Sequence, residues 1–224
     1  MHTYAGIGEN MFNPEMMEKI AKGSGFIAAL DQSGGSTPKA LKGYGIEPDA
    51  YTNDDEMFAL IHAMRSRIIL SPSFSGDRVV GAILFEKTMD GEAGGKAVPQ
   101  ALWEKGVVPF LKVDKGLEEE SSGVQLMKPM PDLDALCGKA VAKGIFGTKM
   151  RSVVNSANPG GIAAIVEQQF AVAEQILGHD LMPIIEPEVN IKSGDREESE
   201  AILAEELASA LDKLPAGKQV MLKL

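Results

Sequence analysis

Ionisable side chains lie near the C-terminal ends of five short apolar segments of this sequence. The segments read "FIAALD", "VPFLKVD", "GTKMRS", "IIEPEV" and "VMLKL". The ionisable residues in them are Asp31, Lys112, Asp114, Lys149, Arg151, Glu186, Glu188 and Lys223. A neutral lysine amine can attack a carbonyl carbon, and a carboxylate can transfer the protons that such a reaction requires. Lysines and carboxylates held in one cavity could therefore perform nucleophilic and acid–base chemistry.

The placement of these charges decides whether they form one site. A single lysine at a strand end is usually a surface or ion-paired residue, Asp31 could instead cap a helix after "SGGST", and "EPE" could be an edge-strand turn. However, side chains two residues apart on a strand point the same way, and buried charges are costly unless they are paired. Recurrence at the same relative position in five segments favours parallel strands whose C-terminal ends converge on one cavity.

The elements that must position these residues alternate along the chain. Short apolar runs predict strands near 26–31, 79–85, 107–113, 145–151, 182–188 and 219–224. Helical patterns separate them, near 13–25, 53–69, 98–106, 131–144, 158–178 and 195–214. The first helix has a complete start signal, because Asn13 can cap it and Pro14 suits its first turn. No long linker or low-complexity segment interrupts the series, so we expect a single domain over residues 1–224.

Two architectures fit this alternation of buried strands and covering helices. An open doubly wound sheet usually has a glycine-rich nucleotide-binding turn after its first strand. The segment "DQSGGST" is rich in glycine but is neither a dinucleotide fingerprint nor a phosphate-binding Walker loop. The charges at the C-terminal strand ends instead favour a (β/α)₈ TIM barrel, of which this sequence contains about six strands.

Composition narrows the class of protein. The net charge of −10 argues against a nucleic-acid partner, although a pocket inside an acidic protein can still be basic. Cys137 is the one cysteine, so it cannot form an internal disulfide, and a reducing compartment is expected. No run of 18 apolar residues and no signal-peptide core is present, so we expect a cytoplasmic protein without membrane partners.

The charged segments also carry a family resemblance. The segments "ALDQSGGS", "LKVDKG", "TKMR", "PIIEPEV" and "MLKL" resemble, in order and rough spacing, the Schiff-base (class I) fructose-bisphosphate aldolases, in their shorter bacterial form. The resemblance implies a lyase of glycolysis and gluconeogenesis, which reversibly cleaves fructose 1,6-bisphosphate to dihydroxyacetone phosphate and glyceraldehyde 3-phosphate. It implies a small-molecule sugar phosphate as substrate, neither a metal ion nor a cofactor, and it is compatible with a homo-oligomer.

The resemblance also implies catalytic roles. Lys223 matches the lysine that forms the Schiff base, and Lys149 matches the lysine that assists formation of the carbinolamine. Glu186 is the best match for the general acid/base, with Glu188 as its neighbour on the same strand face. Asp31 resembles the aspartate that orients the substrate hydroxyls. A lysine nucleophile must lose its proton from a free pKa near 10.4, and a cation at ~5 Å would favour this by roughly two pKa units at an effective dielectric of ~20.

Binding roles follow from the same resemblance. Ser33, Ser36 and Lys112 match contacts to one phosphate of the substrate, and Arg151 matches another substrate-binding position. Hydroxyl and backbone donors beside a cation suit a phosphate cradle. One departure affects this site, because the arginine that animal enzymes carry after the serine-rich turn aligns with Ala40 here.

The family barrel has eight strands, whereas six are predicted here. The last one, "QVMLKL", would be a central barrel strand that stops directly after its reactive lysine. The resemblance therefore implies that the chain is C-terminally incomplete and that strands seven and eight, with their phosphate-binding residues, are absent from it.

Other functions stay open at this point. A metal-dependent aldolase would need a histidine cluster, but only His2, His62 and His179 are available, far apart in the sequence. Transaldolase-like Schiff-base barrels share the lysine but not the whole ordered set. A scaffold protein that has lost catalysis is a further alternative. Cys137 is more typical of a core residue than of a nucleophile, because its segment "LDALCGKAV" is helical.

Overall fold

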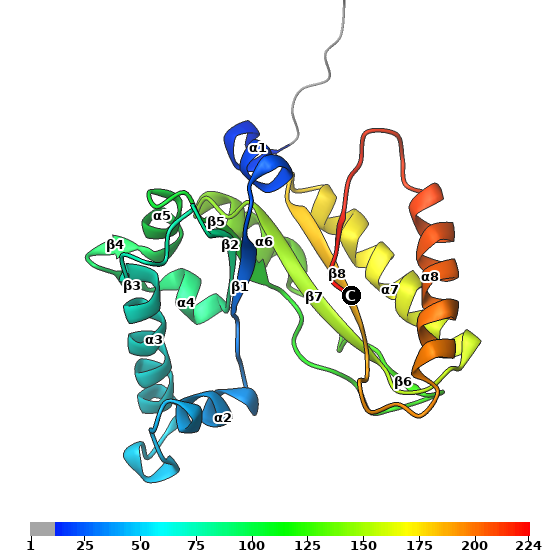
Figure 1. Ribbon diagram of the computed structural model, residues 1–224, viewed down its shortest axis with the longest axis horizontal. Coiled ribbons are helices and arrows are strands. Elements are labelled where there is room, and N and C mark those ends of the chain that lie inside the picture. The colour runs from blue at the N-terminus through cyan, green and yellow to red at the C-terminus, as the bar shows by residue number, and fades with distance from the viewer. Residues whose placement is uncertain (1–11) are drawn as a thin grey trace, which may run out of the picture.

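The computed structural model describes residues 12–224. Its main sheet contains six parallel strands, which pair in the order in which they occur along the chain (Figure 1). They are β1 (Phe26–Leu30), β2 (Val79–Leu84), β5 (Val108–Lys112), β7 (Gly147–Val154), β8 (Met182–Val189) and β9 (Met221–Leu222). A doubly wound sheet reverses its strand order at a switch point, whereas this one progresses in a single direction, as a barrel does.

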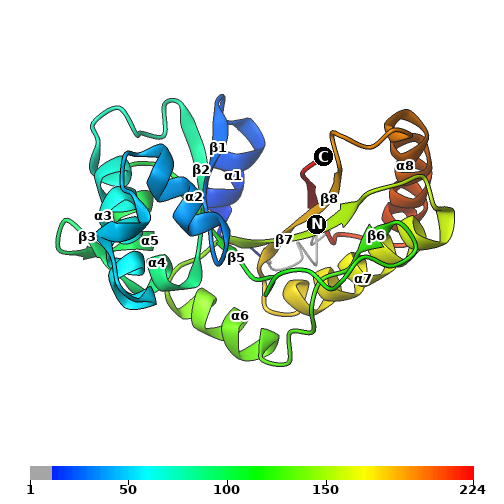
Figure 2. The same cartoon turned by 90° about the horizontal axis from the view of Figure 1, so that it is seen from below.

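Most of the helices cover the sheet on one side. The helices are α1 (Pro14–Lys22), α2 (Ser36–Gly43), α3 (Asp54–Leu70), α4 (Glu86–Asp90), α5 (Val98–Trp103), α6 (Leu133–Ala142), α7 (Pro159–Leu177) and α8 (Arg196–Asp212), with a short 3₁₀ helix at Pro48–Ala50. Figure 2 shows the strands in an arc with most of these helices around its outer side. Within residues 12–224, β1 and β9 do not pair with each other. The sheet is therefore a half-barrel, which confirms the predicted partial TIM barrel.

All six predicted strands are present, with shifts at their ends. The last one, expected over 219–224, is regular only at Met221–Leu222, whereas β7 continues beyond the expected end to Val154. The prediction missed α2, α4 and three short strands. These are the hairpin of β3 (Glu92–Ala93) with β4 (Lys96–Ala97), and β6 (Val124–Gln125), which pairs antiparallel to β7. The short strands contain only two residues each, which is too few to show a hydrophobic period in the sequence.

Local start signals explain where the helices begin. The Asn13 side chain accepts hydrogen bonds from the backbone N–H groups of Glu15 and Met16, both at 3.1 Å, as its predicted capping role requires. Asn53 caps α3 in the same way, with Glu56 N at 3.0 Å. None of the helices in residues 12–224 has both the length and the apolar character of a membrane span.

The concave side of the sheet has an apolar layer below its charges. Ile83, Phe110 and Ile184 pack there with the helix α1, and all three side chains are buried. Gly81 and Gly147 flank Phe110 on the neighbouring strands, and a Cβ atom at either position would lie within 3.0 Å of the Phe110 ring. One aromatic ring therefore fills the space that two glycines leave free. This layer supports the charged strand ends above it.

Candidate active site

Four charged residues from four strands meet at the C-terminal end of the half-barrel. Lys149 lies at their centre, 5% exposed, with its Nζ atom 2.8 Å from Asp31 Oδ2 and 3.1 Å from Glu186 Oε2. The second carboxylate oxygen of Glu186, Oε1, accepts a hydrogen bond from Lys223 Nζ. The Glu186 carboxylate thus lies between two lysine ammonium groups. This satisfies the requirement that buried charges be paired.

Strand register creates this arrangement from residues far apart in the sequence. In the β5–β7 pair, Lys112 lies opposite Lys149, and in the β7–β8 pair Arg151 lies opposite Glu186. The backbone N–H of Lys223 donates to the carbonyl of Ile185 at 2.9 Å, which places Lys223 beside Glu186. Asp31, Lys112 and Lys223 lie at or just beyond the ends of their strands, whereas Lys149 and Glu186 lie within β7 and β8, which extend further toward the same rim.

Burial and neighbouring charges act in opposite directions on Lys149. Burial lowers the pKa of its ammonium group, but the carboxylates of Asp31, Glu186 and Asp114 outweigh this and raise the pKa above its ordinary value. Lys149 is therefore a permanent cation of the site at neutral pH. The Lys223 side chain is different, because 47% of it is exposed and it can meet a molecule arriving from solvent.

The remaining predicted site residues lie around this centre. Glu188 lies two residues beyond Glu186 but forms its own ion pair with Arg151, at 2.7 Å, and both side chains are more than two-fifths exposed. Lys112 Nζ contacts the Asp114 carboxylate at 2.5 Å and the Asp114 carbonyl at 2.8 Å. The structure therefore does not bring the carboxylates of Glu186 and Glu188 to a shared partner, because each has a different cation.

The two serines of the "SGGS" turn bond to each other at the start of α2. The Ser33 N–H donates to Ser36 Oγ at 3.0 Å, and the Ser36 hydroxyl donates to the Ser33 carbonyl at 2.9 Å. Helix α2 begins at Ser36 and Gly35 is its cap residue, so Asp31 is not the helix cap that the sequence left open. The turn is exposed and follows Asp31 directly, at the same end of the sheet.

The sequence prediction missed Arg65. Its side chain is fully buried, and it donates to Thr88 Oγ1 at 2.7 Å and to the backbone carbonyl of Gln32 at 2.5 Å. Burial lowers the pKa of Arg65 to about 10, although Asp31 acts in the opposite direction. A signal existed, because Arg65 lies one helical turn from both Ile61 and Ile69 on the buried face of α3.

Gln169 of α7 was also missed. It is fully buried, and its Oε1 atom accepts a hydrogen bond from the backbone N–H of Glu186 at 2.9 Å. This hydrogen bond joins α7 to β8 at Glu186, the residue that lies between Lys149 and Lys223. Its signal resembles that of Arg65, since Gln169 continues the buried helical row of Ile162, Ile165 and Val166.

Two of the three histidines lie within the described residues, and both bond elsewhere. His62 Nε2 lies 2.9 Å from the Glu92 carbonyl, and His179 Nε2 lies 2.9 Å from the Asp134 carboxylate. Within residues 12–224, no three His, Cys, Asp or Glu side chains are grouped as metal ligands. His2 lies outside the described residues.

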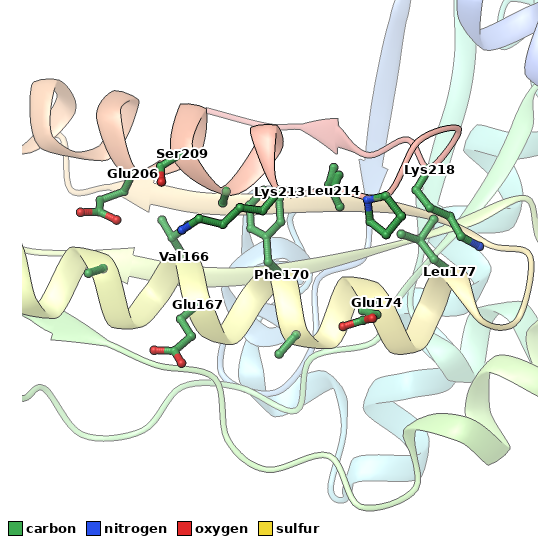
Figure 3. Close-up of a pocket in the computed structure, with 14 residues that line it drawn as sticks. Val166, Glu167, Phe170, Glu174, Leu177, Glu206, Ser209, Lys213, Leu214 and Lys218 are labelled. Carbon is green, nitrogen blue, oxygen red and sulfur yellow. The ribbon is translucent and has the colours of Figure 1, made fainter.

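Two grooves follow α8. One, of about 480 Å³, reaches the charged centre, because Glu186, Glu188 and Lys223 line it together with Arg196 and Leu203. The other, of about 600 Å³, lies between α7 and α8 on the outer side of the sheet (Figure 3). Phe170 and Lys213 project into this outer groove, and none of the charged strand-end residues lines it. The groove beside Lys223 connects the charged centre to solvent.

Comparison with solved structures supports the fold. A similar structure is that of fructose-bisphosphate aldolase from Plasmodium falciparum in complex with TRAP and a small molecule inhibitor. The TM-score is 0.61 at 21% sequence identity, over 78% of this chain and 50% of that chain. The chain therefore spans about half the length of that aldolase, and the match is one of fold.

Comparison with family models identifies the relationship. The model of class-I fructose-bisphosphate aldolase, described as glycolytic, matches residues 14–223. The matched residues run from the first helix to Lys223 and include every strand of the half-barrel. The chain therefore belongs to the class-I fructose-bisphosphate aldolase family.

Proposed function

We propose that this chain carries the Schiff-base centre of an aldolase that cleaves fructose 1,6-bisphosphate reversibly to dihydroxyacetone phosphate and glyceraldehyde 3-phosphate. One observation carries the proposal most directly: the Glu186 carboxylate lies between Lys149 and Lys223, with one oxygen toward each. A nucleophilic amine, a proton carrier and a fixed cation are the groups that this reaction needs. The proposal places the reaction in glycolysis and in the cytoplasm.

Lys223 is the nucleophile in this proposal. Its neutral amine adds to the substrate carbonyl carbon, and the resulting carbinolamine loses water to give an iminium ion. Glu186 is within hydrogen-bond reach of that amine and can donate the proton with which the hydroxyl leaves as water. When the bond between C3 and C4 breaks, the C4 hydroxyl passes its proton to a carboxylate of the site, and the fragment that contains C4 leaves as the aldehyde glyceraldehyde 3-phosphate. The electron pair of the bond moves into the iminium and forms an enamine. Protonation and hydrolysis of the enamine then release dihydroxyacetone phosphate and the free lysine.

Lys149 and Asp31 prepare the site. Lys149 stays charged and holds both carboxylates in place, so Glu186 is oriented toward Lys223 before substrate arrives. Asp31 faces the same centre and is the group assigned to the substrate hydroxyls at the bond that breaks. The serine turn of Ser33 and Ser36, together with Lys112 and Arg151, is assigned to substrate and phosphate binding, with Glu188 holding Arg151.

Trapping of the covalent intermediate tests the proposal. The chain is mixed with dihydroxyacetone phosphate, reduced with borohydride and weighed by mass spectrometry. The wild type should gain one adduct on Lys223. Lys223→Ala and Lys223→Arg should gain none, because neither offers a neutral lysine amine at that place. Lys192→Ala is the control, since Lys192 is exposed on the loop before α8 and should not affect labelling.

Glu186→Gln should separate proton transfer from nucleophilic attack. It preserves the shape of the side chain but cannot donate a proton, a contribution typically worth 10²–10⁴-fold in rate. Turnover should fall by about that factor while an intermediate can still be trapped. An adduct on another lysine in Lys223→Ala, with Lys149 the next candidate, would show that the nucleophile is wrong. A wild type that forms no adduct would support a catalytically silent scaffold.

Chelation tests the independence from metal ions. The iminium supplies the electron sink that a Lewis-acid ion would otherwise provide, so cleavage should continue after exhaustive treatment with a chelator. Activity is measured before and after chelation and again after zinc is added. Loss of cleavage that zinc restores would instead indicate a metal-dependent aldolase.

A further inference from the structure

Arg65 is a buried cation without a direct anionic partner. Its guanidinium hydrogen bonds go to neutral oxygens, namely the Thr88 hydroxyl, the Gln32 carbonyl and, at 3.5 Å, the side-chain amide oxygen of Gln32. Within residues 12–224, no carboxylate forms an ion pair with it, and its Nε atom is buried without a hydrogen-bond partner. A buried charge of this kind is costly unless another charge compensates it. Asp31 directly precedes Gln32, whose carbonyl Arg65 binds, and the Asp31 carboxylate acts on the Arg65 guanidinium.

Arg65 thereby becomes the far end of a row of alternating charges. Asp31 follows Arg65, Lys149 pairs with Asp31, Glu186 pairs with Lys149, and Lys223 pairs with Glu186. The row crosses from the outer helix α3 through β1, β7 and β8 to β9. If one member of the row is displaced, its neighbours lose a partner and interact more strongly with the partner that remains. A change at Arg65 can therefore influence Lys223 at the other end of the row.

The total charge of the row is a second link between Arg65 and Lys223. The three cations Arg65, Lys149 and Lys223 face only two carboxylates, Asp31 and Glu186. The neighbouring charges form two ion pairs of their own, Lys112 with Asp114 and Arg151 with Glu188, and the Asp114 carboxylate also acts on Lys149. The row therefore carries an excess of one positive charge, which removal of the Arg65 charge would abolish.

We propose that Arg65 is a positioning residue of the active site, which anchors the Asp31–Gln32 corner and maintains the row of alternating charges that ends at Lys223. Arg65 does not reach the reacting atoms. It acts by holding the Gln32 carbonyl and by opposing the charge of Asp31, so that Asp31 shares Lys149 with Glu186. The proposal rests on the function proposed above only where it concerns catalysis, because the charge row itself is a property of the free protein.

Competitive acetylation tests this without any enzymatic reaction. The free chain is labelled with trace acetic anhydride at a series of pH values, and mass spectrometry gives the midpoint at which Lys223 becomes reactive. In Arg65→Gln, the midpoint should rise, because the loss of a positive charge from the row leaves the charged form of Lys223 less opposed. Redistribution of Lys149 toward Asp31 has the same sign, because it leaves Glu186 more strongly bound to Lys223.

Two further variants separate charge from packing. Arg65→Lys keeps the positive charge and should leave the midpoint at its wild-type value. Arg67→Gln removes the same charge from an exposed position of the same helix and should also leave it unchanged. A circular dichroism spectrum and a urea unfolding curve show whether each variant folds. If Arg65→Gln does not fold, Arg65→Lys and Arg65→Met are compared instead, using the folded fraction of each protein. This comparison gives the same contrast of charged and neutral side chains.

The outcomes distinguish this inference from the proposed function. A shift in Arg65→Gln and not in Arg65→Lys or Arg67→Gln supports the positioning role, whether or not an adduct with dihydroxyacetone phosphate can be trapped. Equal midpoints in all variants, with only a loss of stability in those at position 65, would reduce Arg65 to a structural residue and overturn the inference. Failure of trapping with a normal shift would instead overturn the proposed function alone.

Discussion

At the scale of single residues, the site depends on which oxygen each lysine contacts. Glu186 gives one carboxylate oxygen to Lys149 and the other to Lys223, and Lys149 divides its contacts between Glu186 and Asp31. Glu186 is 4% exposed, so water cannot replace a lost partner. Catalytic geometry and stability consequently depend on the same few atoms, and removal of one partner should affect both.

Lys149→Met should expose this dependence. The substitution leaves two buried carboxylates facing each other without their shared cation, which typically costs about 3–5 kcal/mol of unfolding free energy. Urea unfolding at pH 7 measures the loss. Lys149→Met combined with Asp31→Asn should recover part of it, because one of the two uncompensated charges is then absent. A loss below about 1 kcal/mol in the single variant would show that Lys149 does not hold the carboxylates as described.

At the scale of elements, the strands position the site by packing closely beneath it. Phe110 of β5 occupies the concave side between Gly81 of β2 and Gly147 of β7. Above this layer, the next inward positions of β5 and β7 are Lys112 and Lys149, which lie opposite each other. Small residues in strands usually cost stability, but here they permit the contact that sets the spacing of the charged rim.

Gly147→Ala should therefore disturb the site from below. The added methyl group would meet the Met182 carbonyl oxygen and lie 2.9 Å from the Phe110 ring, so backbone or ring must move. Overpacking of this kind costs about 1–3 kcal/mol, measured by urea unfolding. The matched control is Gly138→Ala in the exposed face of α6, where a Cβ meets nothing within 4 Å and should add about 0.5–1 kcal/mol of stability. Equal effects of the two substitutions would contradict the packing described.

At the scale of the whole molecule, the half-barrel is held together by a core on each side of its sheet. The larger cluster joins the outer face of the strands to the helices, with Leu84, Leu111 and Ile185 at its centre, and Cys137 of α6 packs into it. Buried ionisable groups occupy both sides of the sheet, with Lys149 on the inner side and Cys137 on the outer side. Because these groups lose their protons at alkaline pH, the unfolding free energy should depend on pH in that range.

The unfolding free energy should fall as pH rises from 9 to 11. Burial raises the pKa of the Cys137 thiol from 9.0 to about 11, so in this range the folded state binds more protons than the unfolded state, and stability falls with pH. Lys149 adds a loss above pH 10.5, since its folded pKa is raised. Arg65 acts oppositely above about pH 10, because its folded pKa is lowered.

Urea unfolding at pH 8 and pH 10.5 measures this dependence in the wild type and in Cys137→Ala. The wild type should lose about 2 kcal/mol more than the variant between the two pH values, the greater part of a two-unit pKa difference. The same dependence in both proteins would show that the Cys137 thiol ionises freely in the folded state, contrary to its burial.

The sequence alone determined the strands, their direction and the set of charges at their ends. Apolar runs of five to eight residues and helical start signals such as Asn13 depend on neighbours in the chain, so the six strands could be predicted from it. The ionisable residues were visible for the same reason, because each interrupts an apolar run. The distinctive order of these segments also indicates the family.

Only the tertiary structure decided which charges are partners. The sequence grouped Glu186 with Glu188, two positions apart, but strand register gives Glu188 to Arg151 and places Glu186 between Lys149 and Lys223. Arg65 reaches the site from α3, through the Gln32 carbonyl after β1 and the Thr88 hydroxyl of α4, and no chemical pattern in its own segment indicates this. Ion pairing depends on distances between strands and on burial, and these arise from packing across the whole sheet, which local sequence does not specify.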